Sequence, residues 1–435
     1  MWRSKIVLAG LVALVAAAVA GGAARADDGR DDARRAELVG YYIQWGLYGR
    51  GYTVKSVETS GSADRLTVLN YAFGNVAPNA AGDVVCQSGD PWADYGVPWD
   101  ATTSVDGKAS SWPFQGNFQQ LKALKALHPK LKVLISLGGW TWSKYFSDAA
   151  LTDETRRTLV SSCIDLFIRG NLPGTPDGTG AGVFDGFDID WEWPGSEGNA
   201  GNHIRPEDRQ NFTKLLAEFR RQLDALRRGY LLTAFLPAAP AKIDAGFEVR
   251  RIFRYLDFAT VQGYDFHGAW DPVTNHQSNL FTSPADPSTP RFSIADTVAA
   301  YLRRGAPARE LVVGVPFYSR GWSGVGSTGN GLYQPATGAA PGTWEAGVED
   351  YKVVKTLVGS GYVRYDDFRA GASWLYNPAT GIFWTYDDPL VLRAKALFTR
   401  AAGLGGVMFW ELSGDTADGE LVRALAAGLR RGGDD

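Results

Sequence analysis

The sequence predicts an α/β protein, a (β/α)8 TIM barrel with a small α+β insertion between its seventh and eighth strands. Two observations favour this fold. Short strand-forming apolar runs alternate with longer amphipathic stretches, which is typical of repeated β-α units around a parallel sheet. Eight such runs can be counted, the number that a barrel needs. The alternative, an open doubly wound sheet, is disfavoured because no Gly-rich phosphate loop follows the first run.

The predicted strands are short, and most are separated by a helical stretch with apolar residues three and four positions apart. The eight strands are predicted at Leu38–Gln44, Leu66–Phe73, Lys132–Leu137, Gly186–Trp191, Leu231–Phe235, Phe258–Tyr264, Leu311–Pro316 and Gly405–Trp410. The clearest helices are predicted at Phe118–Leu127, Asp153–Arg169, Pro206–Arg228, Ile294–Arg304 and Pro389–Ala402.

Two connections are longer than a β-α unit requires. Asn75–Gln115 joins the second and third strands, and Tyr318–Trp384 joins the seventh and eighth. The second is predicted to be an inserted α+β subdomain, residues 318–384, because it contains strand-like pieces of its own. These pieces are Tyr351–Val358, Tyr362–Tyr365, Ser373–Tyr376 and Ile382–Tyr386. Both connections leave the carboxyl ends of strands, where barrels hold their active sites.

The first 26 residues have the pattern of a cleaved export signal. Arg3 and Lys5 give the positive start, Ile6–Ala20 is the apolar stretch, and Ala24–Ala26 supplies the small-residue cleavage pattern. The alternative is a membrane anchor, but the apolar run is short and a polar stretch follows it. We therefore expect residues 27–435 to form the mature barrel, which is secreted, extracellular and has no membrane association after cleavage.

The composition disfavours a nucleic-acid partner and permits a disulfide. The net charge of −3 becomes about −6 when the three positive charges of residues 1–26 are removed, and no basic cluster is present. In an oxidising compartment Cys86 and Cys163 could pair, or they could remain two separate buried thiols. Fifteen tryptophans, many of them in predicted loops, indicate a binding surface or the bracing of long loops.

The most informative segment is Asp185–Pro194, which carries acidic residues at alternate positions. Residues two apart in a strand share a face, so Asp188, Asp190 and Glu192 point one way and the apolar residues between them point the other. In a barrel the apolar set would pack on helices and the acidic set would face the interior. Interior carboxylates are costly unless they share protons or hydrogen bonds, and such a cost indicates chemistry.

Alternatives without catalysis fit this segment less well. A calcium loop needs a polar, Gly-turned backbone, whereas Phe, Ile and Trp separate these acids. A solvated edge strand is disfavoured by the flanking aromatic residues. No metal site is predicted, because the chain has four histidines and no His-Glu-x-x-His pattern, and a Gly-x-Ser-x-Gly elbow is also absent from the sequence.

Packed like charges raise the proton affinity of at least one member of the group. A glycosidase needs one carboxylic acid that stays protonated near neutral pH and delivers its proton to the leaving oxygen. Glu192, at the carboxyl end of the predicted strand, is best placed to be that acid.

The acidic segment matches Asp-x-x-Asp-x-Asp-x-Glu, the signature of glycoside hydrolase family 18, and the rest of the mature chain resembles the same family. The other matching segments follow in barrel order at Gly40–Arg50, Tyr71–Phe73, Ser136–Gly139, Gly263–Gly268, Gly314–Trp322 and Gly406–Glu411. Gln262 replaces the methionine of the family's Met-x-Tyr-Asp motif. The insertion is similar to that of the family's deep-cleft bacterial chitinases.

The resemblance implies a retaining, substrate-assisted mechanism that needs no cofactor. Glu192 would protonate the glycosidic oxygen while the 2-acetamido carbonyl of the substrate attacks the anomeric carbon. Asp190 would hold the acetamido N–H, Asp188 would share a proton with Asp190, and Tyr264 would bond to the acetamido oxygen. Water activated by Glu192 would then open the intermediate.

The resemblance also implies a set of substrate-binding residues. Trp410 would form the floor of the pocket, and Asp265 and Arg320 would bond to neighbouring sugars. Trp45 and Trp140 resemble stacking platforms. The full set expected to bind substrate is Trp45, Phe73, Gly139, Trp140, Gln262, Asp265, Tyr318, Arg320, Glu345 and Trp410.

The predicted protein is therefore a monomeric chitinase whose partners are chitin or N-acetylglucosamine oligomers. One alternative is an endo-acting N-acetylglucosaminidase on N-glycans, which shares the acidic segment, but the insertion and the many aromatic residues favour a long linear polymer. The other alternative is a lectin or inhibitor on the same fold. Such proteins typically lose the terminal glutamate, which is present here as Glu192.

Overall fold

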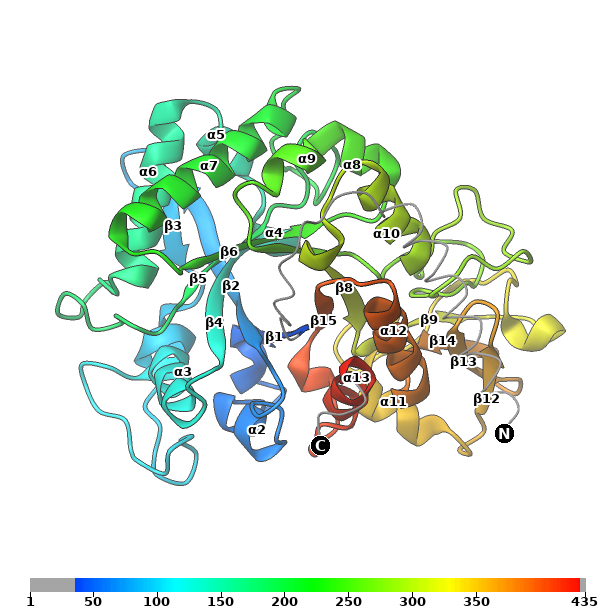
Figure 1. Cartoon of the computed structure of the whole chain (residues 1–435). Helices are drawn as coiled ribbons and strands as arrows, with labels where there is room; N and C mark the ends of the chain where they lie inside the picture. Colours follow the sequence, from blue (N-terminus) through cyan, green and yellow to red (C-terminus); the bar gives the residue numbers. More distant parts are fainter. Residues whose placement is uncertain (1–35, 431–435) are drawn as a thin grey trace. The chain divides into compact units, whose positions relative to one another are not determined.

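The computed structural model describes residues 36–430, and the predicted signal peptide, residues 1–26, lies outside this range. Eight parallel strands follow one sheet order, β1-β15-β8-β7-β6-β5-β4-β2, and a further pairing of β1 with β2 closes the barrel (Figure 1). The strands are β1 (Glu37–Ile43), β2 (Val68–Pro78), β4 (Lys132–Gly138), β5 (Gly186–Asp190), β6 (Leu231–Leu236), β7 (Phe258–Val261), β8 (Leu311–Pro316) and β15 (Gly406–Trp410). The predicted barrel and all eight of its strands are confirmed.

The chain forms two compact units, residues 39–260 and residues 261 onward together with the first residues of β1, and each is described by itself. In the first unit the register of the parallel strands determines which residues are neighbours on adjacent strands. Ser136 of β4 pairs with Asp188 of β5, and Asp188 pairs with Thr233 of β6. A slip of one residue in either pairing would turn these polar side chains to the opposite face.

Helices of the first unit cover the apolar face of its strands. The long ones are α3 (Gly116–Leu127), α6 (Asp153–Cys163), which continues as one π-helical turn (Ile164–Ile168), and α7 (Asp208–Leu226), in good agreement with the predicted helices. The short ones are α2 (Val54–Thr59), α4 (Gly139–Trp142), α5 (Phe146–Ala149), α8 (Pro240–Gly246) and α9 (Val249–Ile252). Phe118 of α3, Phe167 and Phe184 form an edge-to-face aromatic cluster with ring centroids 5.0–6.3 Å apart.

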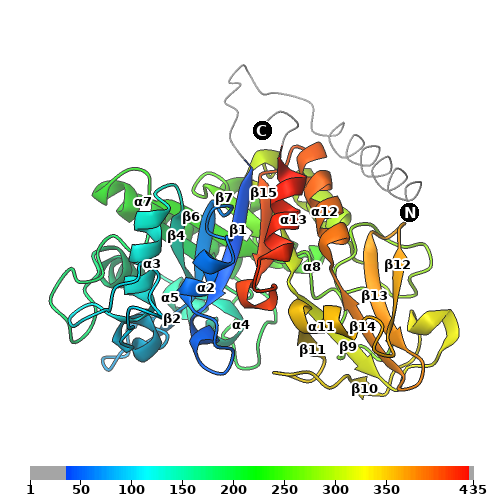
Figure 2. The same cartoon turned by 90° about the horizontal axis from the view of Figure 1, so that it is seen from below.

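The second unit contains a six-stranded antiparallel sheet in the position where the sequence predicts the insertion. Its strands are β9 (Tyr318–Ser323), β10 (Gly338–Ala339), β11 (Val348–Asp350), β12 (Val363–Asp367), β13 (Ala372–Asn377) and β14 (Ile382–Tyr386). Their order is β10-β9-β14-β13-β12, with β11 paired to β9, and Figure 2 shows β12, β13 and β14 side by side. The core of this sheet is aromatic and includes Trp322, Trp374 and Phe383.

The strand-like prediction for Tyr351–Val358 is wrong, because this segment forms helix α11 (Tyr351–Leu357). Its β-branched residues suggest a strand, but Tyr351 and Val354, three positions apart, are the residues that become buried. Burial at helical spacing outweighs the weak local preference for a strand.

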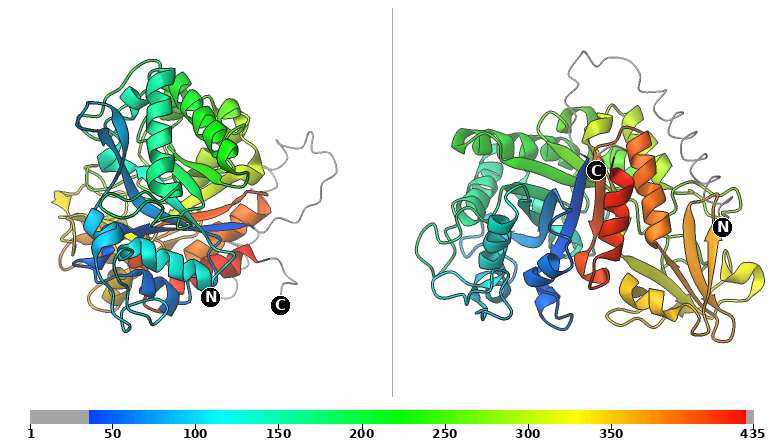
Figure 3. Two further views of the ribbon diagram at one scale, coloured as in Figure 1. Left: turned by 90° about the vertical axis from the view of Figure 1, so that its left-hand side faces the viewer. Right: turned by 60° about the horizontal axis from the view of Figure 1, so that its bottom comes forward.

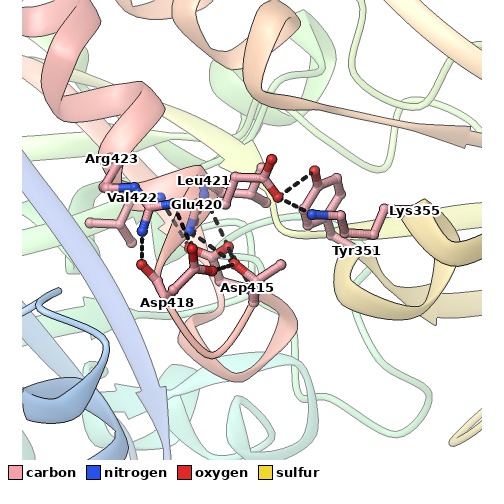
Figure 4. A network of polar contacts seen from close by, with 9 residues as sticks. Tyr351, Lys355, Asp415, Asp418, Glu420, Leu421, Val422 and Arg423 are labelled. Atoms are coloured by element: carbon pink, nitrogen blue, oxygen red, sulfur yellow. Dashed lines mark hydrogen bonds and ion pairs between the residues drawn. The ribbon is translucent and has the colours of Figure 1, made fainter.

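Helices α10 (Ile294–Arg303), α12 (Pro389–Ala401) and α13 (Glu420–Leu429) complete the second unit, and Figure 3 shows α12 and α13 next to each other. Asp415 holds the start of α13 by accepting hydrogen bonds from the N–H groups of Leu421 and Val422 at 2.9 and 3.0 Å (Figure 4). Glu420 accepts a hydrogen bond from the Tyr351 hydroxyl at 3.1 Å, which ties α13 to α11. Among residues 36–430, no helix is long and apolar enough to cross a membrane.

The two cysteines form a disulfide that joins distant parts of the first unit. Cys86 lies in β3 (Val84–Ser88), which pairs antiparallel with β2, and Cys163 is the last residue of α6. Their Cα atoms are 4.9 Å apart across a sequence separation of 77 residues. Of the two possibilities that the sequence leaves open, pairing is therefore the one observed.

Replacing both cysteines, Cys86→Ala with Cys163→Ala, should lower the free energy of unfolding by about 2–4 kcal/mol, because the unfolded chain loses a constraint on a long loop. Urea unfolding followed by circular dichroism measures this change. Wild-type protein treated with a reductant should match the variant, and an unchanged unfolding midpoint in both samples would show that the bridge does not stabilise the fold.

Candidate active site

Asp188 is fully buried in β5 and is held by hydroxyl groups from three other strands. Tyr41 and Ser136 donate to its Oδ2 atom at 2.6 and 2.8 Å, and Thr233 donates to its Oδ1 atom at 2.6 Å. Burial raises the pKa of Asp188, and the three hydrogen bonds offset part of this rise. Its place in the sheet is thus specified by the register of β4, β5 and β6.

Asp190, two residues later on the same face, is almost as deeply buried, with 4% of its surface exposed. Its Oδ1 atom has no hydrogen-bond partner among the described residues. Burial raises the pKa of Asp190 well above its usual range, and the charges of Glu192 and Asp188 raise it further. The sequence predicts a raised proton affinity for at least one member of the acidic group, with Glu192 as the acid. At Asp190 the largest cause of the raised pKa is burial rather than the neighbouring charges.

Glu192 follows the end of β5, and its backbone is held from both sides. Its N–H donates to Ser143 Oγ at 2.8 Å, and its carbonyl accepts from Asn202 Nδ2 at 2.9 Å. Ser143 Oγ also lies 2.8 Å from the carbonyl oxygen of Gly139 and 3.1 Å from that of Asp190. One buried hydroxyl thereby links the helical turn after β4 to the backbone on either side of Trp191.

The apolar residues of the acidic segment face away from the carboxylates and pack against helices, as the alternation predicts. Phe187 contacts Phe219 of α7, with ring centroids 5.2 Å apart. Trp191 stacks on Phe146 of α5 at 5.5 Å with an interplanar angle of 11°. This packing fixes the orientation of β5, and so it determines the face on which Asp188 and Asp190 lie.

Four residues predicted to bind substrate lie in the same unit, and three of them are in contact. Trp45 and Phe73 stack with ring centroids 6.3 Å apart, and Trp45 is 40% exposed. Gly139 has φ of 69°, and a Cβ atom there would lie 2.6 Å from the Phe73 ring, so glycine is required. Trp140 is next in sequence and 51% exposed. The exposed indole rings of Trp45 and Trp140 suit the stacking of sugar rings.

The second unit brings together another set of predicted residues around Asp265. The Arg320 guanidinium donates through Nε and Nη2 to the two carboxylate oxygens of Asp265 at 2.8 and 2.9 Å, and the Tyr318 hydroxyl donates to Oδ1 at 2.6 Å. Tyr264 is buried beside this group and packs edge-on against Tyr318 at 6.1 Å. Asp265 has φ of 57°, an unusual value for a residue other than glycine. A bidentate ion pair can hold the backbone in such a conformation.

The remaining predicted residues also lie in the second unit. Gln262 directly follows β7, and Trp410 is the last residue of β15. Burial lowers the pKa of Arg320, but the charge of Asp265, its hydrogen bond to Arg320 and the charge of Glu345 outweigh burial and leave the pKa raised. Glu345 thus acts on the Asp265–Arg320 pair through its charge.

Sequence reasoning missed several residues that shape the site. Tyr41 and Thr233 are polar residues inside apolar strands, and their position in β1 and β6 is a signal that could have identified them. Ser143 and Asn202 lie in connections without a periodic pattern, so the sequence gives no indication of their contact with Glu192. No group of three or more His, Cys, Asp or Glu within residues 36–430 is arranged to hold a metal ion.

The raised pKa of Asp190 predicts that the variant Asp190→Asn becomes more stable than the wild type as the pH rises. At pH 4, where about half of the unfolded aspartate is still protonated, the two proteins should differ least. Above that pH only the folded wild type retains the proton, so its stability falls relative to the neutral amide. Urea unfolding from pH 4 to pH 8 measures the difference.

Asp100→Asn provides a control of opposite sign, since hydrogen bonds from Thr102 and Thr103 lower the pKa of Asp100 to about 2. That variant should be destabilised at neutral pH. A variant Asp190→Asn that is less stable than the wild type across the whole range would show that the carboxylate is not strained by burial.

The family model for glycosyl hydrolases family 18 matches residues 37–415 of the chain. Among curated relatives, the chain is 38% identical to chitinase A1 of Niallia circulans and 39% identical to chitinase C of Streptomyces lividans, over 91% of this chain in each case. It spans only 59% and 60% of the length of these two relatives. The catalytic domain of the psychrophilic chitinase B from Arthrobacter TAD20 superposes with a TM-score of 0.84 at 46% identity, covering 91% of this chain and 95% of that one. The chain therefore belongs to glycosyl hydrolases family 18.

Proposed function

We propose that the protein is a chitinase that cleaves β-1,4 bonds between N-acetylglucosamine units, with the acetamido group of the substrate as nucleophile and with retention at the anomeric carbon. The observation that carries this proposal is the buried pair Asp188 and Asp190 leading to Glu192 at the end of β5. Family membership and the chitinase relatives support the substrate class. Because the chain spans about 60% of those relatives, the activity is assigned to the described barrel and not to further domains.

Glu192 is the proposed proton donor to the glycosidic oxygen. Its backbone is fixed by Ser143 and Asn202, which limits the positions that its carboxyl group can reach. After the leaving sugar departs, the carboxylate accepts a proton from the water that attacks the anomeric carbon. One residue thus serves as acid in the first step and as base in the second.

Asp190 is the proposed partner of the acetamido N–H. Its Oδ1 atom, buried and without a partner among residues 36–430, is available to accept that hydrogen bond. The bond strengthens as positive charge develops on the acetamido group during attack. Asp188, held by its three hydroxyl donors, shares a proton with Asp190, so that Asp190 can become ionised when the charge appears.

Tyr264 is the proposed donor to the acetamido oxygen, and Trp410 the floor beneath the reacting sugar. The motif match supports both roles. Asp265, Tyr318 and Arg320 form a rigid polar group beside Tyr264, suited to the hydroxyl groups of an adjacent sugar. The exposed aromatic rings of Trp45 and Trp140 suit stacking on sugars farther along the chain.

The proposal extends to processing and location. Residues 1–26 form a signal peptide, and residues 27–435 are secreted and act as a monomer outside the cell. Residues 318–384 form the insertion subdomain, which the sheet from β9 to β14 supports.

Glu192→Gln tests the proton donor, because the amide has the same shape but no dissociable proton. Turnover of N-acetylglucosamine oligomers should fall by about 10²–10⁴-fold while binding measured by calorimetry is retained. Glu197→Gln is a matched control, since Glu197 is an exposed glutamate five residues away. A Glu192→Gln variant with more than half of the wild-type activity would contradict the assignment.

A series of substrates, tested with the same wild-type protein, tests the role of the acetamido group. Fully deacetylated chitosan and cello-oligosaccharides lack the internal nucleophile and should not be cleaved. The sizes of the products from a chitin oligomer series should show cleavage of chitin. The anomer that NMR detects first should have the same configuration as the substrate, which shows retention. Inversion, or efficient cleavage of cello-oligosaccharides, would contradict the acetamido mechanism, and cleavage restricted to N-glycans would favour the alternative glycosidase.

A further inference from the structure

Helix α12 carries a lysine that is completely buried and takes no part in the chemistry proposed above. Lys395 has no exposed surface, and its partner Asp387, at the end of β14, is 3% exposed. Burial lowers the pKa of Lys395 and raises that of Asp387 to about 6, so both charged forms are disfavoured by their surroundings. A buried ion pair is often no more stabilising than apolar residues of the same size, so its presence calls for another explanation.

The three protons of the Lys395 ammonium group all have acceptors. One is donated to Asp387 Oδ2, one to the carbonyl oxygen of Ser278, and one to Ser278 Oγ at 2.6 Å. An ammonium group can only donate, so the hydroxyl of Ser278 must use its oxygen as acceptor toward Lys395. The proton of that hydroxyl is left for another acceptor, and the carbonyl oxygen of Gly263 lies 2.5 Å from Oγ. The Asp387 carboxyl also interacts with this hydroxyl, which lowers the pKa of Asp387, so the contact of Lys395 with Asp387 leaves the Gly263 carbonyl as the second acceptor within reach.

Tyr264 and Asp265 lie in a turn, residues 263–266. Gln277 and Ser278 bind the two ends of this turn. Ser278 binds the carbonyl of Gly263, and the carbonyl of Gln277 accepts from the N–H of Phe266 at 3.0 Å. A Cβ atom at Gly263 would lie 2.1 Å from the carbonyl oxygen of Gly314 in β8, so the turn also fits closely against the sheet. The turn has little room to move without losing one of these contacts.

Gln277 also connects this turn to strand β9, which carries Tyr318. Its Nε2 atom donates to the carbonyl oxygen of Tyr318 at 2.8 Å, and Tyr318 in turn binds Asp265. The peptide segment 274–279 is polar throughout and buried, with each residue at most 4% exposed. A buried polar segment with these contacts determines the backbone position of the candidate site residues on either side of it.

We propose that Lys395, together with Asp387, is a positioning residue that orients the Ser278 hydroxyl toward Gly263 and thereby sets the position of the Tyr264 side chain. The effect on catalysis rests on the role proposed for Tyr264 at the acetamido oxygen. A displacement of Tyr264 would weaken a contact that matters most in the transition state. The turnover number should therefore respond more than the binding of substrate.

Ser278→Ala removes the oriented hydroxyl and leaves the backbone acceptor for Lys395 in place. The value of kcat on N-acetylglucosamine oligomers should fall by about 10- to 100-fold, with KM changed less than about twofold. The matched control is Ser373→Ala, another buried serine, whose hydroxyl donates to Asp366 at 2.8 Å. The control should leave kcat unchanged. An unchanged kcat in a folded Ser278→Ala variant would overturn the proposal.

A second variant separates positioning from stability. Lys395→Met combined with Asp387→Leu replaces the ion pair by apolar side chains, which should keep the melting temperature near that of the wild type. The value of kcat should nevertheless fall as it does in Ser278→Ala, because the hydroxyl is no longer oriented. Full activity in this stable double variant would show that the pair has only a structural role. If the double variant does not fold, Ser278→Ala and the cycle described next decide the question.

A double-mutant cycle with Tyr264→Phe identifies the residue through which the effect passes. If Ser278 acts through Tyr264, adding Ser278→Ala to Tyr264→Phe should lower kcat by less than about twofold. Losses that multiply in full would overturn the positioning proposal while leaving the role of Tyr264 intact. Wild-type kcat in Tyr264→Phe alone would instead overturn the role of Tyr264 and the inference that rests on it.

Discussion

Two carboxylates inside one strand, Asp188 and Asp190 of β5, impose the constraint on which the candidate site depends. Removing an aspartate from water is costly unless the group is hydrogen-bonded or keeps its proton. Asp188 meets this demand with hydroxyl groups from β1, β4 and β6, so the register of the sheet serves the site directly. Asp190 has an oxygen without a partner among the described residues and a pKa raised well above its usual range. Burial and the neighbouring charges thus favour the protonated form of Asp190, the residue proposed to bind the acetamido N–H.

The succession of strands and helices could be predicted because their apolar residues follow simple periodicities. All eight barrel strands and the alternation of Asp188, Ile189 and Asp190 follow from the spacing of apolar residues. The helix α11 could not be predicted, because its β-branched residues acquire a helical burial pattern only through packing. The disulfide could not be predicted from the sequence either, because Cys86 and Cys163 are brought together only where β3 lies against the end of α6.

Contacts between a regular element and an irregular segment were also inaccessible to sequence reasoning. Ser143 and Asn202 bind the backbone of Glu192 from connections without periodicity. Lys395 occupies an apolar position of α12, and its acceptors come from a segment more than one hundred residues earlier and from the end of β14. Around the Glu192 backbone and around Lys395, polar groups are thus placed inside the protein, close to residues with proposed catalytic roles. Buried polar groups are costly unless they are hydrogen-bonded, and functional sites commonly contain groups of this kind.

The central claim is that burial keeps a proton on Asp190, and a direct titration tests it best. Aspartate labelled with ¹³C at the side-chain carboxyl would be followed by NMR in the folded protein between pH 3 and pH 9, and Asp188→Asn and Asp190→Asn would assign the two resonances. The coupled pair should show a titration with an apparent pKa well above the value of about 3.9 for an exposed aspartate, and this step should be absent in Asp190→Asn. If both carboxyl groups titrated at or below that value, Asp190 would be an ordinary ionised carboxylate and the account would be wrong.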